Sequence, residues 1–497
     1  SAQAPVRAGF VVAALGRGDG SALNGFLAAD DPIKGLEAWF GGAVWETLSK
    51  DRAALIAAVN RDIAEIDDLI GDQVDAILHH KRFQTLEASW RGLAYLTAQG
   101  AGWDDVLIRV LTASWRELCR DFERAVEFDQ SQLFHKVYSE EFGMPGGRPF
   151  GVLLCDYTVA HRPAKGRETD DVAGLRGLSL AAAAAFCPAI VGADPALFGL
   201  ETFRELGLPQ NLKAVFQQDE YVRWRRFRDA EDSRFIGVTA PRVLMRAPYG
   251  DDSAVRWGFR YREDAGGLSL ADHCWGAAVY AYGSVLMRAF AQSGWFADIR
   301  GARADQPGGG RVEGLPVPAF ATDAEDAAAK FAVEVALSAA VEKELDDLGF
   351  LPLSRCKDTP YLAFYGNQSA QTVKAYDSPA ATANARLSAM LRYMFCVSRF
   401  AHYVKVQVRD RLGTYNTAEH VERMLEDWLR EYTLGNDDAA LELKARRPLR
   451  EASVQVRDAP GKPGSYACVI HLKPHFQLDQ VFSSFKLVTE LNNAAPR

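Results

Sequence analysis

Several features that mark common protein classes are missing from this sequence. Cysteine is sparse: the seven cysteines are odd in number and scattered, and no two of them form a Cys-x-x-Cys pair. A disulfide framework and a cysteine-based zinc site are therefore disfavoured. We expect buried free thiols in a reducing compartment. The cysteines are Cys119, Cys155, Cys187, Cys274, Cys356, Cys396 and Cys468.

Long apolar runs and a positive net charge are also absent. No stretch reaches the roughly 18 apolar residues of a membrane span. The short run Ala8–Leu15 is interrupted at once by Gly16 and Arg17, unlike a signal peptide. Acidic residues outnumber basic ones by 65 to 57, a net charge of −8. We therefore expect a cytoplasmic protein that inserts into no membrane and binds no nucleic acid.

The usual chemical motifs are missing as well. The sequence contains no GxxxxGK[ST], GxGxxG, HExxH or GxSxG pattern. The glycines Gly308–Gly310 lead into Arg311 and Val312, which cannot hold phosphate and magnesium as a P-loop does. His79 and His80 are adjacent, so on a helix they diverge by about 100° and make a poor metal pair. We predict no catalytic residue, no metal ligand and no cofactor, and so no enzyme. An enzyme would need a pocket with perturbed titratable groups.

What the chain does contain is a mixture of helical and strand-like patterns. A length of 497 residues predicts two or three domains. Strand and helix patterns alternate through the middle, which predicts an α+β fold with a mixed α/β core and long helices. We divide the chain into an N-terminal arm (residues 1–50), a helical region (51–100), the mixed core (101–445) and C-terminal β-strands (446–497).

The clearest pattern predicts one long helix over Asp51–His80. Its apolar residues recur at steps of four and three and form a single stripe, with acidic side chains such as Asp62 and Glu65 on a solvated face between them. A long one-sided helix is typical of helix–helix docking, so we assign the stripe to a partner interface. The stripe consists of Leu55, Val59, Ile63, Ile66, Ile70, Val74 and Ile77.

Further elements follow from the same reasoning. Strands are predicted at Val106–Leu111, Phe150–Cys155 and Ala189–Val191, and a long helix is predicted from Pro379 to Leu412. A second helix, Thr417–Tyr432, begins at an N-cap threonine.

The terminal segments alternate with period 2 and predict strands with few neighbours in their own chain. Such strands invite pairing with another chain, so we assign them to joints between protomers. The candidate residues are Phe10, Val11 and Val12 near the N-terminus, and Cys468, Ile470, Leu472, Phe485, Leu487 and Thr489 near the C-terminus.

A basic run with interleaved aromatic residues lies in the middle of the chain. Arg223, Arg225, Arg226 and Arg228 surround Trp224 and Phe227 on a predicted helix. RNA binding and an acidic protein surface both fit this pattern. We favour the acidic protein surface and treat these arginines as a candidate charged interface.

Several long phrases of the sequence are far more specific than any short motif. They are Gln73–Leu96, Phe128–Tyr157, Glu342–Leu353, Ala380–Tyr403, Lys444–Glu451, Pro460–Tyr466 and Lys473–Gln477. Together they resemble one family, the large subunit of the type VI secretion contractile sheath (TssC/VipB). The resemblance covers residues 55–491, whereas residues 1–50 depart from the arm of well-known members.

The resemblance implies a phage tail sheath-like fold with strand-exchanging terminal arms. It implies a small sheath subunit (TssB/VipA-like) as obligate partner, docked through helices, and a helical lattice of copies around an inner Hcp-like tube. Contraction would propel that tube, in a membrane-anchored apparatus with a baseplate. A recycling AAA+ ATPase (ClpV-like) is a further candidate partner. The alternative is a low-copy baseplate or adaptor protein on the same fold, which would form particles instead of tubes.

Overall fold

A computed structural model describes most of the chain, namely residues 21–250, 259, 261–265, 270–302, 308–317, 332–356, 359, 361–410, 417–436, 438–458, 466–475 and 485–491. The predicted strand Ala8–Leu15, with Phe10, Val11 and Val12, lies outside the described residues. The chain forms two compact units: residues 1–87 with 246–274 (unit 1), and residues 88–245 with 275–497 (unit 2). The functional division into four segments remains a prediction.

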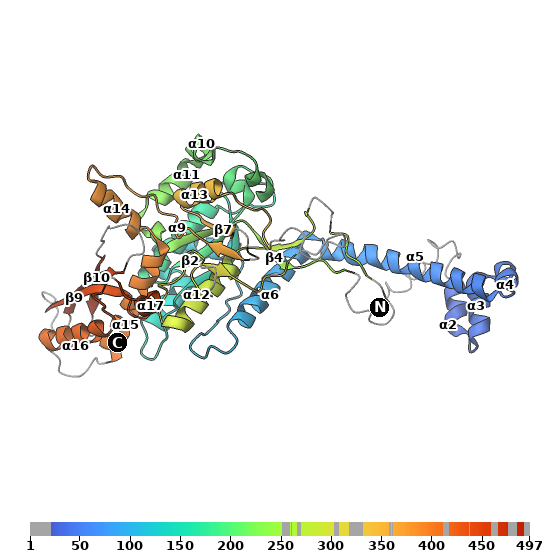
Figure 1. The fold of residues 1–497 in the computed structure, drawn as a ribbon, viewed down its shortest axis with the longest axis horizontal. Coiled ribbons are helices and arrows are strands. Elements are labelled where there is room, and N and C mark those ends of the chain that lie inside the picture. The colour runs from blue at the N-terminus through green and yellow to red at the C-terminus, as the bar shows by residue number, and fades with distance from the viewer. Residues whose placement is uncertain are drawn as a thin grey trace. The chain divides into compact units, whose positions relative to one another are not determined.

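Unit 1 is built around a long helix. Short helices α2 (Ser21–Ala28), α3 (Pro32–Phe40) and α4 (Gly42–Leu48) lie at the N-terminal end of α5 (Arg52–Leu78), as Figure 1 shows. Asp51 caps α5, because its side chain accepts hydrogen bonds from the backbone N–H of Ala53 at 2.8 Å and of Ala54 at 3.2 Å. The long helix predicted over Asp51–His80 is confirmed.

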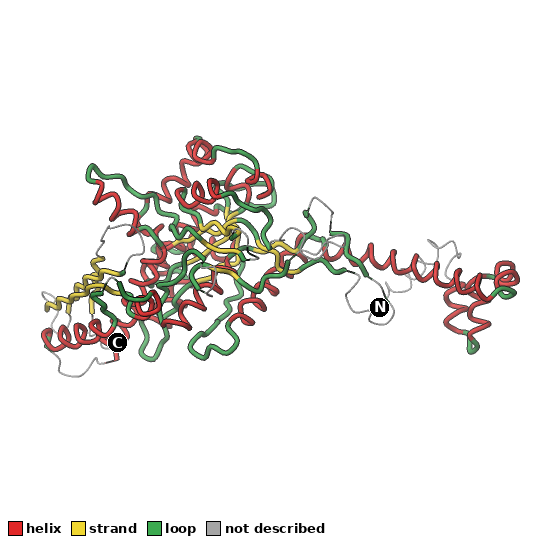
Figure 2. The backbone as a smooth tube through the Cα atoms, in the orientation of Figure 1, coloured by secondary structure: helices red, strands yellow, loops and turns green. Residues whose placement is uncertain are grey.

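Unit 2 contains a six-stranded sheet in the order β1-β2-β3-β7-β8-β6. Figure 2 draws strands in yellow and helices in red. Neighbouring strands from β1 to β7 run parallel, and β8 is antiparallel to both β7 and β6. The alternation of helices and strands seen in the sequence therefore corresponds to crossover connections, with an antiparallel edge. The strands are β1 (Leu153–Val159), β2 (Ala189–Ala193), β3 (Ile236–Ala240), β6 (Arg311–Val312), β7 (Leu351–Arg355) and β8 (Leu362–Phe364).

Helices of unit 2 cover this sheet and build its core. None of the helices in the described part of the chain is long and apolar enough to cross a membrane. The helix α6 (Lys81–Gln99) runs from unit 1 into unit 2. The α-helices beyond it are α7 (Trp115–Arg124), α8 (Gln132–Phe134), α9 (Asp171–Ala184), α10 (Leu212–Gln217), α11 (Val222–Asp229), α12 (Val279–Ser293), α13 (Ala339–Asp347), α14 (Pro379–Ser388), α15 (Leu391–Asp410), α16 (Ala418–Glu431) and α17 (Leu441–Arg446).

Shorter elements connect the larger ones. One of them is a π-helix, η2 (His135–Phe142), which directly continues α8. The 3₁₀ turns are η1 (Phe128–Gln130), η3 (Pro195–Phe198), η4 (Phe203–Gly207), η5 (Asp219–Tyr221) and η6 (Glu231–Phe235). A separate two-stranded sheet pairs β4 (Val243–Arg246) with β5 (Cys274–Gly276).

The C-terminal region of unit 2 forms a second sheet with its own core. Its strands β9 (Leu449–Asp458), β10 (Tyr466–Pro474) and β11 (Phe485–Leu491) are antiparallel, with β10 in the middle. The three C-terminal strands predicted from the alternating pattern are confirmed. Their inner face packs on α15 and α16, where Phe400, Leu425 and Val454 are buried.

Two predicted elements are wrong. The helix predicted from Pro379 to Leu412 is interrupted, because the backbone between α14 and α15 bonds elsewhere: Ser369 N–H donates to Ala389 O, and Leu391 N–H donates to Asn367 O. The strand predicted at Val106–Leu111 is not formed, although the segment has the expected residue types, because no strand of the described chain pairs with it.

Candidate docking surface and its polar base

The long helix α5 exposes a row of isoleucines. Ile56, Ile63, Ile70 and Ile77 follow one another at intervals of seven residues, and their exposed fractions are 49%, 48%, 40% and 56%. Seven-residue spacing is the signature of a coiled-coil seam, in which each such side chain inserts between residues of a facing helix. Sequence reasoning found the last three of these residues but missed Ile56, whose seven-residue spacing from Ile63 could have revealed it.

The other predicted stripe residues lie beside this row. Leu55, Val59, Ile66 and Val74 are half-buried. Val59 and Ile66 follow Ile56 and Ile63 by three residues each, as the second core position of a heptad does. The predicted stripe therefore lies on one side of α5, where three of its residues are exposed and four are half-buried.

A different side of α5 is already covered by its own chain. Ala58 and Asp62 are the buried residues of this helix, and the indole Nε1 of Trp39 on α3 donates a hydrogen bond of 2.7 Å to Asp62 Oδ2. Asp62 was predicted to lie on a solvated face. This prediction is wrong, because Asp62 is buried and its carboxylate accepts the hydrogen bond of the indole. The small helices thus hold α5 from one side and leave the isoleucine row available.

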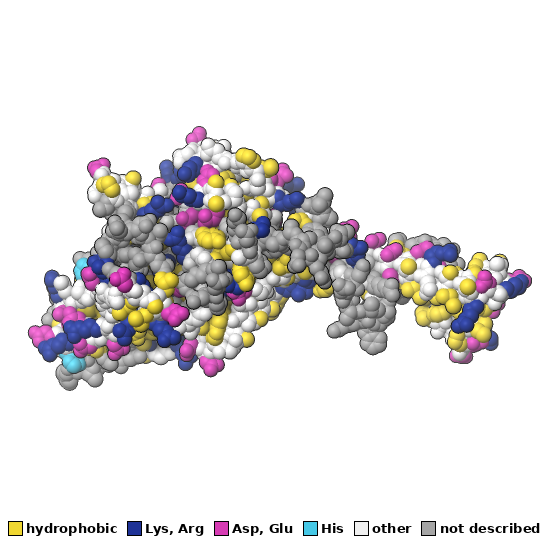
Figure 3. All heavy atoms as spheres, viewed as in Figure 1, with side chains coloured by type: hydrophobic (Ala, Val, Ile, Leu, Met, Phe, Trp, Pro, Cys, Tyr) yellow, Lys and Arg dark blue, Asp and Glu magenta, His cyan; other side chains and the backbone are white. Residues whose placement is uncertain are grey.

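Exposed apolar side chains also gather on the small helices themselves. Figure 3 shows hydrophobic side chains over the α2–α4 end of unit 1, and Leu27, Ile33 and Val44 are among the exposed large hydrophobic residues there. Single exposed apolar residues are ordinary, but a contiguous group marks an interaction surface. The docking surface can therefore extend from α5 onto these helices.

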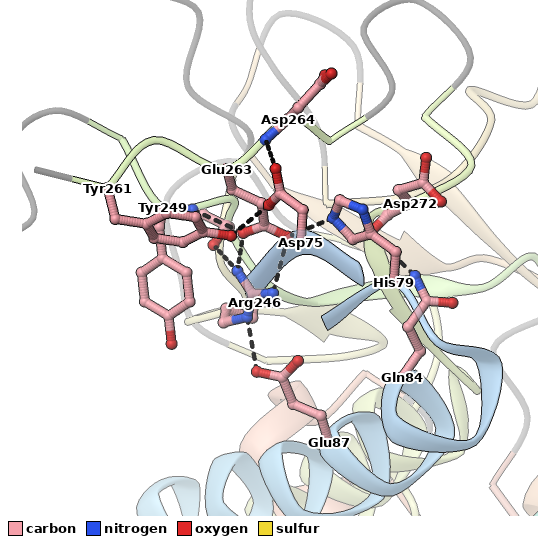
Figure 4. A network of polar contacts seen from close by, with 11 residues as sticks. Asp75, His79, Gln84, Glu87, Arg246, Tyr249, Tyr261, Glu263, Asp264 and Asp272 are labelled. Atoms are coloured by element: carbon pink, nitrogen blue, oxygen red, sulfur yellow. Dashed lines mark hydrogen bonds and ion pairs between the residues drawn. The ribbon is translucent and has the colours of Figure 1, made fainter. Parts of the chain in front are cut away.

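A buried arginine anchors the C-terminal end of α5 to the loop that follows β4. Arg246 Nε lies 2.7 Å from Glu87 Oε1 on α6, and its Nη2 lies 3.0 Å from Glu263 Oε1 (Figure 4). Glu263 also accepts the Tyr249 N–H at 3.0 Å and lies 3.3 Å from His79 Nε2. Three further groups, Glu87, the Tyr249 N–H and His79, therefore converge on one carboxylate and one guanidinium.

Ion pairing and hydrogen bonding affect the pKa values of this network more than burial does. Burial alone would raise the pKa of Glu263, but hydrogen bonds from Arg246 and from the Tyr249 N–H hold that pKa below its usual range. Burial likewise favours loss of the Arg246 proton, yet the bonds to Glu263 and Glu87 raise the pKa of the guanidinium. Both groups are ionised, so the network is a stable ion cluster and not a proton-transfer site.

Asp75 extends the same network along α5. Its carboxylate accepts a hydrogen bond from the Tyr261 hydroxyl and another, at 3.3 Å, from the Asp264 N–H. Gln84 Nε2 donates to Asp272 O at 3.1 Å (Figure 4). The C-terminal end of α5 is thereby tied to residues almost two hundred positions away in the sequence. His79 participates as a structural partner, and His80 is exposed.

No metal centre accompanies these residues in the described part of the chain, where no three His, Cys, Asp or Glu side chains form a possible ligand group. A small hollow in unit 2 is lined by Arg392, Tyr393, Cys396, Lys444 and His475, among others. Burial raises the pKa of Cys396 to about 12, so its thiol is not a nucleophile at neutral pH. The hollow carries no catalytic assignment.

The basic run lies on α11, where much of it serves the chain's own fold. Arg225 Nη1 donates to Phe216 O at 2.8 Å and to Gln218 O at 2.7 Å. Arg228 is buried and donates to Ala370 O at 2.9 Å, and burial lowers its pKa to about 10. Arg223 pairs with Asp170, while Arg226 is exposed.

The predicted joint residues of the C-terminal sheet have two environments. Cys468, Ile470 and Leu472 on β10 are buried in the core of their own unit. Phe485, Leu487 and Thr489 lie on β11, which pairs with β10 in the register Leu472↔Phe485, Ile470↔Leu487 and Cys468↔Thr489. The other outer strand, β9, is partly occupied, because the Val456 N–H donates to Glu422 Oε2 on α16 at 2.7 Å.

Comparison with known proteins agrees with this architecture. Residues 60–371 match the model of the EvpB/VC_A0108 tail sheath N-terminal domain, and residues 380–491 match that of the EvpB/VC_A0108 tail sheath gpW/gp25-like domain. The chain is 38% identical over 442 residues to the type VI secretion system sheath protein TssC1 of Pseudomonas aeruginosa, an alignment that covers 88% of this chain and 87% of the relative.

Proposed function

Because this chain belongs to the type VI secretion tail sheath family and is a subunit of a type VI contractile sheath, we propose that helix α5 is the surface on which the small sheath subunit docks. The observation that carries the proposal is the exposed row Ile56, Ile63, Ile70 and Ile77. A helix of the partner with a matching apolar seam would cover this row in a coiled coil. The comparisons offer no support for the alternative of a low-copy adaptor protein.

The charge around the row indicates the chemistry of the partner helix. Asp67 follows Ile63 by four residues, which is a flanking position of the seam, and it is half-buried beside Ile66. Charged residues that flank a coiled-coil seam select partners of opposite charge. The partner helix therefore carries apolar residues at heptad spacing and a basic residue opposite Asp67.

In the assembly that we propose, the paired subunits polymerise into a helical tube around an inner tube of Hcp-like rings. Contraction of the tube drives the inner tube outward, one end rests on a baseplate, and an AAA+ ATPase recycles the contracted form. Membership of the tail sheath family supports this assignment. The exposed Arg226 on α11 is the remaining candidate for contact with an acidic surface of the inner tube or of a neighbouring subunit.

The terminal strands join neighbouring protomers in this proposal. Among the described strands the open edge is that of β11, because β10 is central and α16 already reaches the backbone of β9 through Glu422. Pairing at a sheet edge uses backbone hydrogen bonds and tolerates movement of the flanking linkers. Residues Phe10, Val11 and Val12 are the candidate strand that a neighbour would add.

The docking proposal is tested by placing charges in the isoleucine row. We expect Ile63→Asp combined with Ile70→Asp to abolish co-purification of the small subunit. Fully burying an isoleucine contributes about 1.5–3 kcal/mol, and docking can bury only the roughly half of each side chain that is exposed. The pair therefore corresponds to an affinity loss on the order of 10- to 10²-fold, to which the cost of burying two charges adds. Both side chains are exposed in the free chain, so the substitutions should not disturb its fold.

The matched control places the same two charges elsewhere on α5. Ala57 and Ala64 are exposed and each follows a row isoleucine by one residue, so they point about 100° away from the row. Ala57→Asp combined with Ala64→Asp should leave co-purification unchanged. Retention of the small subunit by a folded Ile63→Asp, Ile70→Asp variant would refute docking on α5.

A further inference from the structure

Residues 106–111 (VLIRVL) are an exposed extended segment that pairs with no strand of the described chain. Four of their side chains are well exposed, namely Leu107 (63%), Ile108 (37%), Val110 (67%) and Leu111 (50%). Branched aliphatic residues of this kind are enriched in half-buried strands. Consecutive exposed apolar residues are unusual on the surface of a monomeric protein and mark a contact with another molecule.

The chain holds this segment in place without using its apolar side chains. Arg109 forms an ion pair with Glu141, and its guanidinium carbon lies 5.6 Å from the centre of the Phe150 ring. Just after the segment, the Tyr157 hydroxyl donates to Ala113 O. These contacts fix the Arg109 side chain and the C-terminal end of the segment. The entropy cost of ordering the segment on binding a partner is therefore smaller.

Glu141 is itself fixed, which makes the anchor firm. Its Oε2 accepts the Arg148 N–H at 2.8 Å. That hydrogen bond and the Arg109 guanidinium together hold the pKa of Glu141 below its usual range. The positive charge of Arg109 is therefore neutralised within the chain, and the segment presents apolar side chains beside the exposed acidic pair Asp104 and Asp105.

We propose that residues 106–111 are a docking strand, which pairs through backbone hydrogen bonds with an extended apolar strand of the small sheath subunit. The inference rests on the proposed function, since it adds a second contact to the same partner. Strand addition joins two chains by main-chain hydrogen bonds, while alternate side chains supply apolar contacts. The strand predicted from the sequence at Val106–Leu111 then forms only in the complex.

The acidic residues beside the segment favour a strand of the small subunit over a second copy of this chain. Asp104 and Asp105 lie at one end, so the partner strand carries apolar residues followed by lysine or arginine at the end that lies beside them. A second copy of this chain does not fit. Antiparallel pairing of two copies would place Thr112 and Ala113 opposite the acidic pair, and it would close a two-fold contact that cannot propagate along a helical lattice.

Substitutions within the co-expressed complex test the side-chain and backbone contacts separately. Val110→Asp should reduce the small subunit retained with this chain at least tenfold. Adjacent N–H groups of a strand point to opposite sides, so one of Val110→Pro and Leu111→Pro should do the same by removing a donor. The control is Val126→Asp, since Val126 is an 89% exposed apolar residue outside the segment, and it should retain the small subunit fully.

Amide hydrogen exchange on the purified small–large heterodimer gives a readout that does not depend on variants. Alternate amides of residues 107–111, those that face the partner strand, should be protected in the heterodimer. Exchange at the rate of an unstructured chain would overturn the inference, even if the isoleucine variants of α5 still release the small subunit. Protection that appears only in assembled tubes would assign the strand to a neighbouring copy and would also overturn it. Protection in a heterodimer that tolerates the α5 variants would refute the docking role of α5 alone.

Discussion

Arg246 is enclosed in unit 1 with two carboxylates directly on its guanidinium, from Glu87 and Glu263. Desolvating three charges is costly, and the cost is offset only while every member keeps its partners. Removal of one member would leave a buried charge without compensation, so the cluster defines one arrangement of the α5 end. Its residues are separated by about 160–185 positions in the chain, so no local pattern could reveal it.

A buried histidine, His402 on α15, should make the folded chain sensitive to acid. Its Nε2 lies 2.9 Å from Ala185 O, and burial, with Arg399 and Lys405 nearby, lowers its pKa to about 3. The unfolded chain takes up this proton near pH 6.5, whereas the folded chain resists it. Stability that is fully present above pH 6.5 is therefore lost as the pH falls towards 3, by about 1.4 kcal/mol per pH unit for this proton.

Urea unfolding of wild type and His402→Gln between pH 7 and pH 4 measures this effect. The unfolding free energy of the variant should change less steeply with pH than that of wild type. The difference in slope should correspond to about one proton, whatever the stability of the variant at neutral pH. Some dependence should remain, since burial also lowers the pKa of His161 and of His273. If the unfolding free energies of the two proteins changed in parallel with pH, His402 would not titrate as a buried group.

At the scale of elements, a glycine explains part of the sequence phrase around Trp90. Gly92 lies on α6 where this helix meets Tyr280 of α12, and a Cβ there would lie 2.3 Å from the Tyr280 ring. The two helices can approach this closely only because residue 92 has no side chain. The Trp-Arg-Gly-Leu stretch thus encodes a helix contact.

Gly92→Ala should destabilise unit 2 by about 1–3 kcal/mol, the usual cost of forcing an atom into a packed site. The control is Gly42→Ala at the start of α4, where a Cβ would meet nothing within 4 Å and stability should not fall. Thermal unfolding of both variants checks the prediction. A Gly92→Ala variant as stable as wild type would mean that α6 and α12 are not in close contact.

At the scale of the whole molecule, the proposed function assigns docking and polymerisation to different parts of the chain. The isoleucine row belongs to unit 1, and the C-terminal sheet belongs to unit 2. Under the proposed function, a variant can therefore lose tube formation and still keep the small subunit. This separation makes the two proposals independently testable.

Deletion of residues 1–20, which include Phe10, Val11 and Val12, should leave the small–large heterodimer intact and prevent long tubes. The isoleucine row on α5 is untouched, so docking persists, whereas the strand that a neighbour would add is lost. Size-exclusion chromatography measures the heterodimer, and negative-stain microscopy shows the tubes. Regular tubes from the truncated protein would contradict the joint role of these residues.

Local patterns in the sequence were sufficient for the elements whose apolar residues recur on one side. The helix α5 and the antiparallel strands β9 to β11 were predictable, because spacing of apolar residues reports directly on helix or strand. The family resemblance was likewise carried by long contiguous phrases. Tertiary structure alone decided which side of α5 is covered, since the Trp39–Asp62 bond joins separate helices. It also decided where the helix beyond Pro379 breaks, because the backbone of Asn367 and Ser369 takes the bonds there. Residues 106–111 show the same limit: their side chains specify a strand, but a strand exists only where a second backbone supplies the hydrogen bonds.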